Sequence, residues 1–262
     1  MKSFTRVLKI FPRYTVAIHN LGFFNTIKIL YLRLFPQTKI QQINTKKFGK
    51  IYWRPKLDFG VITHFFNPQV GLDTRNDKPN VIFDIGANIG YVSIAMSKLV
   101  GRKGKVYSFE AIPETAQKCM RNLNLNSCNN VFLTNKAVSH KAEKVIFRIP
   151  EGGENHPMAS MVWHKKMENI KNIEVETIVI DSDLRFNSLS PSFLKIDVEG
   201  AEGNVVLGME KLIKKCHPVI FIECSKAGRK IVWEVLKKIH YSCYHAVTKE
   251  HISEFKKYWS DD

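Results

Sequence analysis

The chain has 262 residues and a balanced composition, with 44% hydrophobic and 24% charged residues. Such a chain is long enough for one or two folded domains, and its 14 Gly and 10 Pro exclude a fibrous or largely disordered protein. The five cysteines contain no C-x-x-C pair, which excludes a zinc knuckle or a redox motif built on that spacing. An odd number of cysteines without such a pair predicts a reducing compartment, the cytoplasm.

Positive charge is concentrated at the start of the chain. Residues 1–57 contain 12 Lys and Arg and no Asp or Glu, so this stretch carries +12 of the net charge of +16. Only fourteen uncharged residues lie between Arg13 and Lys28, fewer than the ~20 that a membrane span needs. The basic stretch therefore predicts either a cap packed on the following domain or a peripheral contact with the anionic inner face of a membrane.

The pattern of the sequence changes near residue 78, which separates a basic extension, residues 1–77, from a domain, residues 78–262. Short apolar runs alternate with helical stretches in this domain. The expected strands are 81–85, 105–109, 131–134, 193–196 and 219–222, and the expected helices are 90–100, 113–125, 202–215 and 226–239. This alternation predicts βαβ units, and hence an α/β fold with a mostly parallel sheet covered by helices on both faces.

The middle of the domain departs from this alternation. Residues 144–149 and 173–180 have the pattern of antiparallel or edge strands. Between them, residues 151–166 form a loop that is long for a compact domain. We expect this loop either to be mobile or to act as a lid over a site.

A glycine-containing turn follows the first predicted strand, in the run VIFDIGANIGYVSIA. Gly86 and Gly90 let the backbone approach a ligand, and the start of the following helix favours an anionic group. A dinucleotide-binding turn needs G-x-G-x-x-G, but Asn88 and Tyr91 occupy the places of its second and third glycines. The turn fits instead the methionine end of S-adenosylmethionine, with Asp84 placed to offset positive charge.

An acidic residue, Glu110, follows the second predicted strand, twenty residues after Gly90. A carboxylate in that place can accept hydrogen bonds from both hydroxyls of a ribose. Because the glycine turn precedes it, we favour binding of the cofactor's adenosine part over a surface or helix-capping role.

Charged residues also surround the end of a later predicted strand, in the run FLKIDVEGAE. Lys195 and Asp197 share a face of this buried strand, so a cation and a carboxylate would lie beside the reactive end of the cofactor. Methyl transfer to a hydroxyl requires alignment and removal of the alcohol's proton, and Asp197 or Glu199 is the predicted base. Glu202 is expected only to complement the dipole of the following helix. The two carboxylates also leave a divalent metal open, without support from histidine or cysteine spacing.

Several motifs together resemble the FkbM family of S-adenosylmethionine-dependent methyltransferases. They are FDIGANIGY (83–91), SFEAIPE (108–114), NLNLN (122–126), NKAVS (135–139), FLKIDVEGAE (193–202), GMEKL (208–212) and IFIEC (220–224). The resemblance covers roughly residues 50–223. It implies the class I methyltransferase fold, a Rossmann-like α/β architecture with a mostly parallel seven-stranded sheet and helices on both faces.

The resemblance also implies roles for individual residues. The residues implied to bind S-adenosyl-L-methionine are Asp84, Gly86, Asn88, Gly90, Glu110 and Ala137. Those implied to act at the site of methyl transfer are Lys195, Asp197 and Glu199. The family usually has Glu-Pro after the second strand, whereas Ala111 follows Glu110 here and the proline stands at position 113.

The implied acceptor is a sugar hydroxyl of a glycan, glycolipid or glycosylated metabolite, because the family commonly methylates such alcohols. Enzymes that methylate base amino groups typically carry Asp-Pro-Pro-Tyr, or a related motif, after the strand that corresponds to residues 193–196. Methylation of a base at C5 needs Pro-Cys. Neither occurs here. A ribose 2′-hydroxyl of RNA stays open because Lys195, Asp197 and the basic N-terminus suit it, although we favour a sugar over nucleic acid. A protein that binds the cofactor or a membrane without catalysis is the remaining alternative.

Overall fold

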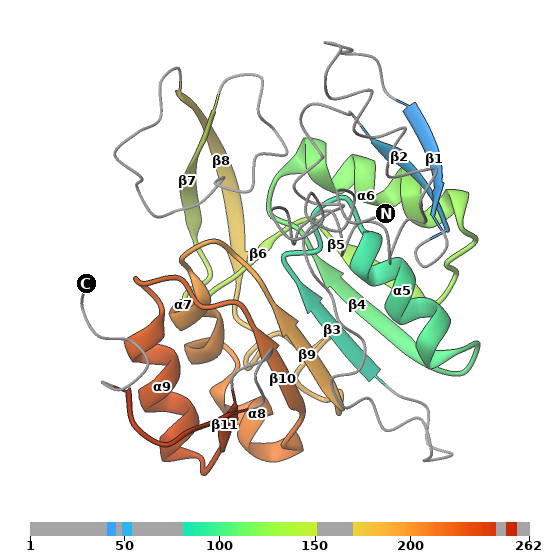
Figure 1. Cartoon of the computed structure of the whole chain (residues 1–262). Coiled ribbons are helices and arrows are strands. Elements are labelled where there is room, and N and C mark those ends of the chain that lie inside the picture. Colours follow the sequence, from blue (N-terminus) through green and yellow to red (C-terminus); the bar gives the residue numbers. More distant parts are fainter. Residues whose placement is uncertain (1–40, 46–48, 54–80, 151–169, 245–249, 256–262) are drawn as a thin grey trace, which may run out of the picture.

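The computed structural model describes residues 41–45, 49–53, 81–150, 170–244 and 250–255. At its centre, five parallel strands lie in the order β10-β9-β3-β4-β5 (Figure 1). Their bounds are β3 Val81–Ile85, β4 Lys105–Phe109, β5 Val131–Thr134, β9 Phe193–Ile196 and β10 Val219–Ile222. The chain builds outward from β3 in one direction and returns to build from β9 in the other. In sheets of this kind ligands bind at the carboxyl ends of the strands beside this reversal.

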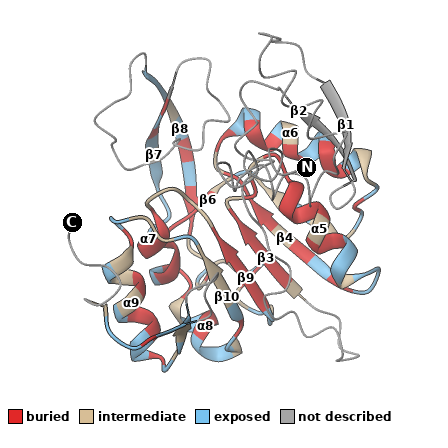
Figure 2. Ribbon diagram, in the orientation of Figure 1, coloured by how far each residue is buried: buried red, intermediate tan, exposed pale blue. Residues whose placement is uncertain are grey.

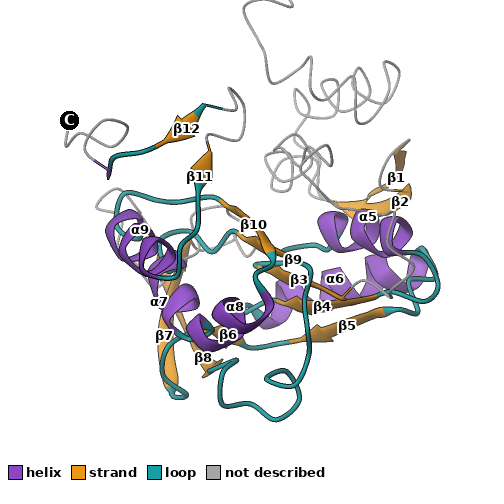
Figure 3. Cartoon of the chain, turned by 90° about the horizontal axis from the view of Figure 1, so that it is seen from below, coloured by secondary structure: helices purple, strands orange, loops and turns teal. Residues whose placement is uncertain are grey.

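Helices connect the strands and cover the sheet. They are α5 Tyr91–Val100, α6 Pro113–Leu125, α7 Glu202–Leu207, α8 Glu210–Cys216 and α9 Arg229–Lys238. In Figure 3, α5 lies above the strands and α8 below them. This arrangement follows from the strand order, because right-handed crossovers that build in opposite directions place their helices on opposite faces. The α/β fold class predicted from the sequence is confirmed.

The hydrophobic core lies on both faces of this sheet, and in Figure 2 β3 and β9 are its most buried strands. The larger cluster joins Phe83 and Leu194 of the strands to Val205, Ile213 and Leu236 of α7, α8 and α9. A smaller cluster lies beneath α5 and α6 and contains Ala87, Ile94, Cys119, Leu123 and Cys128. These clusters fix the ends of β3 and β9, where the predicted site residues lie.

One predicted helix, residues 202–215, is two helices in the structure. The break falls at Gly208, where an added Cβ would lie 2.0 Å from the carbonyl oxygen of Ser139. The glycine therefore permits a close approach of two backbones that no side chain would allow. The second helix has its own cap, because the Asp181 carboxylate accepts hydrogen bonds from the N–H groups of Lys211 and Leu212 at 2.9 Å.

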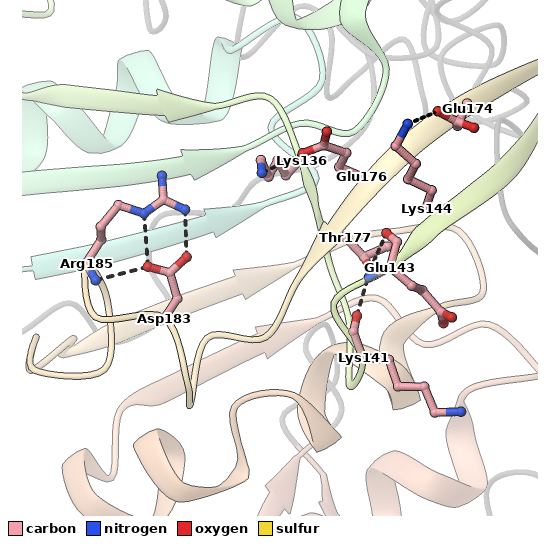
Figure 4. A network of polar contacts seen from close by, with 9 residues as sticks. All are labelled: Lys136, Lys141, Glu143, Lys144, Glu174, Glu176, Thr177, Asp183 and Arg185. Carbon is pink, nitrogen blue, oxygen red and sulfur yellow. Dashed lines mark hydrogen bonds and ion pairs between the residues drawn. The ribbon is translucent and has the colours of Figure 1, made fainter.

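A second, three-stranded sheet has the order β6-β8-β7 and rises beside the main sheet (Figure 1). Its strands are β6 Ala137–Val138, β7 Lys144–Pro150 and β8 Ile170–Ile178. The antiparallel pairing of β7 with β8 confirms the predicted pattern. An exposed ion pair joins β7 to β8, Lys144 to Glu174, and Lys136, directly before β6, pairs with Glu176 of β8 (Figure 4). The predicted lid, residues 151–166, lies outside the described residues.

The predicted strand number was wrong for the part of the chain that the structure describes. The main sheet there has five strands and not seven, because β11 Cys243–Tyr244 and β12 His251–Ile252 pair with each other in a sheet of their own. In the basic extension, β1 Gln41–Thr45 and β2 Gly49–Trp53 form a hairpin, and β2 lies beside α6. The rest of the extension is outside the description, so the boundary at residue 78 stays a prediction. Within the described residues no helix is both long and apolar enough to span a membrane.

Candidate functional site

The glycine turn connects β3 to α5 and has an unusual backbone. Gly86, Asn88 and Gly90 have φ values of +79°, +51° and +86°, in the region that favours glycine. An added Cβ on Gly86 would lie 1.8 Å from the carbonyl oxygen of Asp197, and one on Gly90 would lie 2.7 Å from Cys119 Sγ. The turn is therefore pressed against the segment after β9 on one side and against α6 on the other.

Glu110 lies directly against this turn. Its Oε2 accepts a hydrogen bond from Asn88 N–H at 2.8 Å, and its Oε1 accepts one from Ile112 N–H at 2.9 Å. The side chain is buried, and this burial raises the pKa of Glu110 although both hydrogen bonds act in the opposite direction. The N–H groups of Gly86 and Ala87 both donate to the carbonyl of Phe109. The turn and the predicted ribose-binding carboxylate therefore form one connected unit.

Lys195 connects the glycine turn after β3 with the segment after β9, the two predicted parts of the site. Its ammonium donates to the carbonyl of Gly86 at 2.6 Å and lies 3.4 Å from both Asp84 Oδ1 and Asp197 Oδ2. Its side chain is only 5% exposed. Burial by itself would lower the pKa of Lys195, but the charges of Asp197 and Asp84 outweigh it and raise the pKa above its ordinary value. Lys195 is therefore a permanent cation.

Asp84 completes this buried cluster at the end of β3 and is fully enclosed. Its Oδ2 accepts a hydrogen bond from Ser93 Oγ, which also shares a hydrogen bond of 2.8 Å with Ser108 Oγ. Its Oδ1 has no hydrogen-bond donor within the described parts of the chain. A buried carboxylate needs compensation for lost hydration, and Lys195 supplies it here.

Glu199 lies two residues beyond Asp197 and is partly buried. Its φ of +50° is rare for a residue other than glycine, and residues held in such conformations often cluster at functional sites. Burial, with the carboxylates of Asp197, Glu223 and Glu202, raises the pKa of Glu199 to about 7. A carboxylate that exchanges its proton near neutral pH is suited to act as a general base.

The structure also shows the surroundings of Glu202 and Ala137, two residues considered from the sequence. Glu202 is buried, accepts a hydrogen bond from Gly200 N–H at 2.7 Å and another from Ser225 Oγ at 2.8 Å. It therefore ties the loop after β9 to the loop after β10, which is more than the predicted complement to a helix dipole. Ala137 lies in a hydrophobic cluster with Ile112, two residues after Glu110. Its contact with a cofactor stays a prediction.

Sequence reasoning missed two residues of this site, Tyr91 and Glu223. Tyr91 is buried at the start of α5, and burial raises the pKa of its phenol far above the ordinary value, so the phenol keeps its proton. The charges that act on it include those of Lys195, Asp197 and Glu223. Glu223 directly follows β10 at the same edge of the sheet. The pattern that singled out Glu110, an acid directly after a predicted parallel strand, would have found it.

The carboxylates of this region do not form a metal centre in the described ranges. No group of three or more His, Cys, Asp and Glu residues there could hold a metal ion. The described cluster consists of carboxylates around one lysine, with Asp84 and Asp197 each 3.4 Å from the Lys195 ammonium.

Comparison with known proteins shows which family the chain resembles. The model of the methyltransferase FkbM domain matches residues 84–254, more than half of the chain. Protein-L-isoaspartate O-methyltransferase of Fervidobacterium nodosum is 40% identical over 50 residues, 19% of this chain and 25% of that protein. The enzyme of the same name from Ignicoccus hospitalis is 39% identical over 57 residues, 22% of this chain and 26% of that protein. The chain thus spans about a quarter of the length of these curated relatives.

Among solved structures, the methyltransferase FkbM of Methylobacillus flagellatus is 15% identical, with a TM-score of 0.42. The match covers 89% of this chain and 54% of that one. The extent of the family match carries the assignment. Together with the parallel sheet and its glycine turn, it shows that this chain belongs to the FkbM methyltransferase family.

Proposed function

We propose that this methyltransferase uses S-adenosyl-L-methionine and transfers its methyl group to a hydroxyl, specifically a sugar hydroxyl of a glycan, glycolipid or glycosylated metabolite. The observation that carries the proposal is the connection between the glycine turn and Glu110, whose carboxylate accepts the Asn88 N–H at 2.8 Å. This connection puts a backbone turn and a buried acid side by side at the carboxyl edge of the sheet.

The chain's own residues fit such a cofactor. Gly86 and Gly90 let the turn pack directly against Asp197 and Cys119, where a side chain would not fit, and this packing gives the turn the shape proposed to receive the cofactor. The Glu110 carboxylate retains lone pairs beyond its two backbone hydrogen bonds, because each carboxylate oxygen can accept more than one. When bound, the cofactor supplies an electrophilic methyl group. Asp84, Gly86, Asn88 and Gly90 would then lie beside its methionine part and Glu110 beside its ribose.

Glu199 is our choice for the base, ahead of Asp197. Asp197 is engaged in an ion pair with the permanent cation Lys195, whereas the pKa of Glu199 is about 7. As the acceptor oxygen gains the methyl group, its proton would pass to the Glu199 carboxylate. Lys195 stays protonated and therefore has no role as a proton acceptor.

The acceptor proposal rests on the charges at this edge of the sheet. Asp197, Glu199 and Glu223 offer carboxylate oxygens, which accept hydrogen bonds from the hydroxyls of a sugar. The same carboxylates would repel the phosphates of RNA. The names of the matched relatives, which are O-methyltransferases, agree with an oxygen acceptor.

A lipid-linked acceptor would also give the basic extension a purpose. Residues 1–57 carry +12, and we propose that they hold the enzyme at an anionic membrane surface. Flotation with vesicles of neutral lipid alone, and with anionic lipid added, tests this. Binding that needs the anionic lipid and weakens in high salt supports the proposal, and equal recovery with both vesicles contradicts it.

Calorimetric titration tests the cofactor. S-adenosylmethionine and S-adenosylhomocysteine should bind the protein, and NAD should not. Glu110→Ala should weaken S-adenosylhomocysteine binding by about tenfold or more, the effect of a lost hydrogen bond to a charged group. The matched control is Glu114→Ala, an exposed acid in the first turn of α6, which should leave the affinity unchanged. Absence of binding by both sulfur compounds, or binding of NAD in their place, would overturn the proposal.

A screen for methyl transfer to simple methyl glycosides and to a glycolipid tests the acceptor and the base together. With any acceptor so found, Glu199→Gln should lower kcat by about a hundredfold or more, the usual contribution of a general base. The activity of the unaltered enzyme should rise with pH through about 7, because the base must be unprotonated. Glu234→Gln, at an exposed position of α9, should keep both the rate and the pH profile.

A further inference from the structure

The Lys195 ammonium contacts the end of β3, the glycine turn and the segment after β9. It lies 2.6 Å from the carbonyl oxygen of Gly86, 3.5 Å from that of Ile85 and 3.4 Å from each of two carboxylates. An ammonium has three hydrogens and no lone pair, so it donates to the two carbonyl oxygens and attracts the two carboxylates through its charge. Asp84 and Gly86 belong to the proposed cofactor side, and Asp197 to the acceptor side.

The backbone already holds these pieces close together. Lys195 is the strand partner of Asp84, and Asp197 N–H donates to the carbonyl of Ile85 at 3.1 Å. A Cβ on Gly86 would meet the carbonyl oxygen of Asp197 at 1.8 Å. The backbone pairing sets where Asp197 begins, but it does not fix the direction of its side chain. The ammonium of Lys195 lies 3.4 Å from Asp197 Oδ2 and attracts it toward the turn.

A role for Lys195 in accepting a proton does not fit its surroundings. The ammonium is enclosed, and the two carboxylates beside it favour the protonated form. A cation in this place acts on the reaction only through the groups that it holds or whose charge it offsets. Glu199 is one of these groups, since the charge of Lys195 lowers its pKa, against burial and against the carboxylates of Asp197, Glu223 and Glu202, which raise it.

We infer that Lys195 is a positioning residue whose buried ammonium fixes the Asp197 carboxylate against the glycine turn, so that one cation sets the geometry of both sides of the site. Asp197 is then an oriented, paired carboxylate that helps to place the acceptor, and the proton goes to Glu199. The assignment of these two sides to the cofactor and the acceptor rests on the proposed function, whereas the contacts of Lys195 do not depend on it.

The test compares Lys195→Met, which removes the cation, with Lys195→Arg, which keeps it. Carbon-13 NMR of labelled Glu and Asp side chains, assigned with Glu199→Gln, follows the titration of Glu199 without any ligand. In Lys195→Met the pKa of Glu199 should rise above its value in the unaltered protein, and in Lys195→Arg it should stay close to that value. Lys98→Met, at an exposed position of α5, is the matched control and should leave the titration unchanged.

Calorimetry with S-adenosylhomocysteine supplies a second readout. Lys195→Met should weaken binding by about tenfold or more, since the carbonyl of Gly86 loses a charge-assisted hydrogen bond that shapes the turn. A folded Lys195→Met protein with unchanged Glu199 titration and unchanged affinity would overturn the inference. A purely structural role would lower the melting temperature and leave the Glu199 titration where it was, which also overturns it.

A fallback keeps the test decisive if Lys195→Met does not fold. The double variant Asp84→Asn with Lys195→Met removes one buried anion together with the cation, so Asp84 leaves no unpaired charge. It should still show the raised pKa of Glu199. If the unaltered protein fails to bind S-adenosylhomocysteine, the proposed function fails, while the NMR titration still decides the role of Lys195.

Discussion

Lys195 and Lys144 each hold carboxylates, but in opposite surroundings. Lys195 lies 3.4 Å from Asp84 and Asp197 in the interior, with 5% of its side chain exposed. Lys144 lies 2.7 Å from Glu174 on the second sheet, with 64% of its side chain exposed (Figure 4). The exposed pair is shorter, yet water screens its charges and competes for its hydrogen bonds. The buried contacts are longer and act through a less polarisable medium.

The comparison teaches that burial, more than distance, decides what an ion pair does in this protein. Removing one partner of a buried pair leaves an uncompensated charge, whereas an exposed residue regains water. An exposed pair such as Lys144 with Glu174 on the second sheet, at 2.7 Å, can therefore be altered with little consequence for the fold. The Lys195 cluster cannot, and it lies where the function is proposed.

A large loss of stability is expected from forcing apart the backbones beneath the buried cluster. Gly86→Ala would add a Cβ 1.8 Å from the carbonyl oxygen of Asp197, at a φ of +79°. It should destabilise the protein by about 3 kcal/mol or more, from overpacking together with backbone strain. Gly101→Ala has a similar φ of +65° but nothing within 4 Å, and should cost about 1–2 kcal/mol. Urea unfolding measures both, and equal losses would show that the contact with Asp197 contributes nothing.

A double-mutant cycle sharpens the comparison of the two lysines directly. Lys195→Met should destabilise the protein by about 3–5 kcal/mol, and Asp84→Asn in the same protein should recover part of this loss. The corresponding cycle of Lys144→Met and Glu174→Gln should give a coupling too small to measure. Both cycles use urea unfolding at one pH and salt concentration. A coupling energy of the surface pair as large as that of the buried pair would contradict the conclusion that burial decides the strength of these interactions.

The smallest effect concerns the dependence of stability on pH. The pKa of Glu199 in the folded protein is about 7, above its ordinary value of 4.5. The folded state therefore binds this proton more tightly than the unfolded state, so the contribution of Glu199 to stability falls as pH rises from 4.5 to about 7. Glu199→Gln should gain in melting temperature relative to the unaltered protein at pH 8 compared with pH 5. Because Glu199 is partly exposed, the gain should be small, and an opposite trend would show that its pKa is not raised.

Local pattern was enough to predict most of the central sheet. The bounds of β3 and β9 agree with the apolar runs VIFDI and FLKI, because continuous burial on both faces of a parallel strand leaves a continuous apolar run. The pairing of Lys195 with Asp197 was also predictable, since alternate residues of a strand share a face.

The rest depended on contacts between distant parts of the chain. The break at Gly208 exists because Ser139 approaches it, and nothing near residue 208 in the sequence indicates that approach. The second partner of Lys195, Asp84, comes from a strand 111 positions earlier, so only the order of the strands reveals it. The count of seven strands was wrong within the described residues because β11 and β12 pair with each other.

The position of β9 in the sheet has a consequence for how the protein is made. Ile85 and Lys195 are neighbours in space but 110 positions apart in the chain. During synthesis, β3, the turn and Glu110 leave the ribosome well before β9 does. The native cation beside Asp84 is therefore missing until a long loop closes, a step with a large entropic cost and a slow rate. The turn then reaches its packed form only when β9 has joined the sheet, so a ligand that binds at this turn, as proposed, would report that β9 is in place.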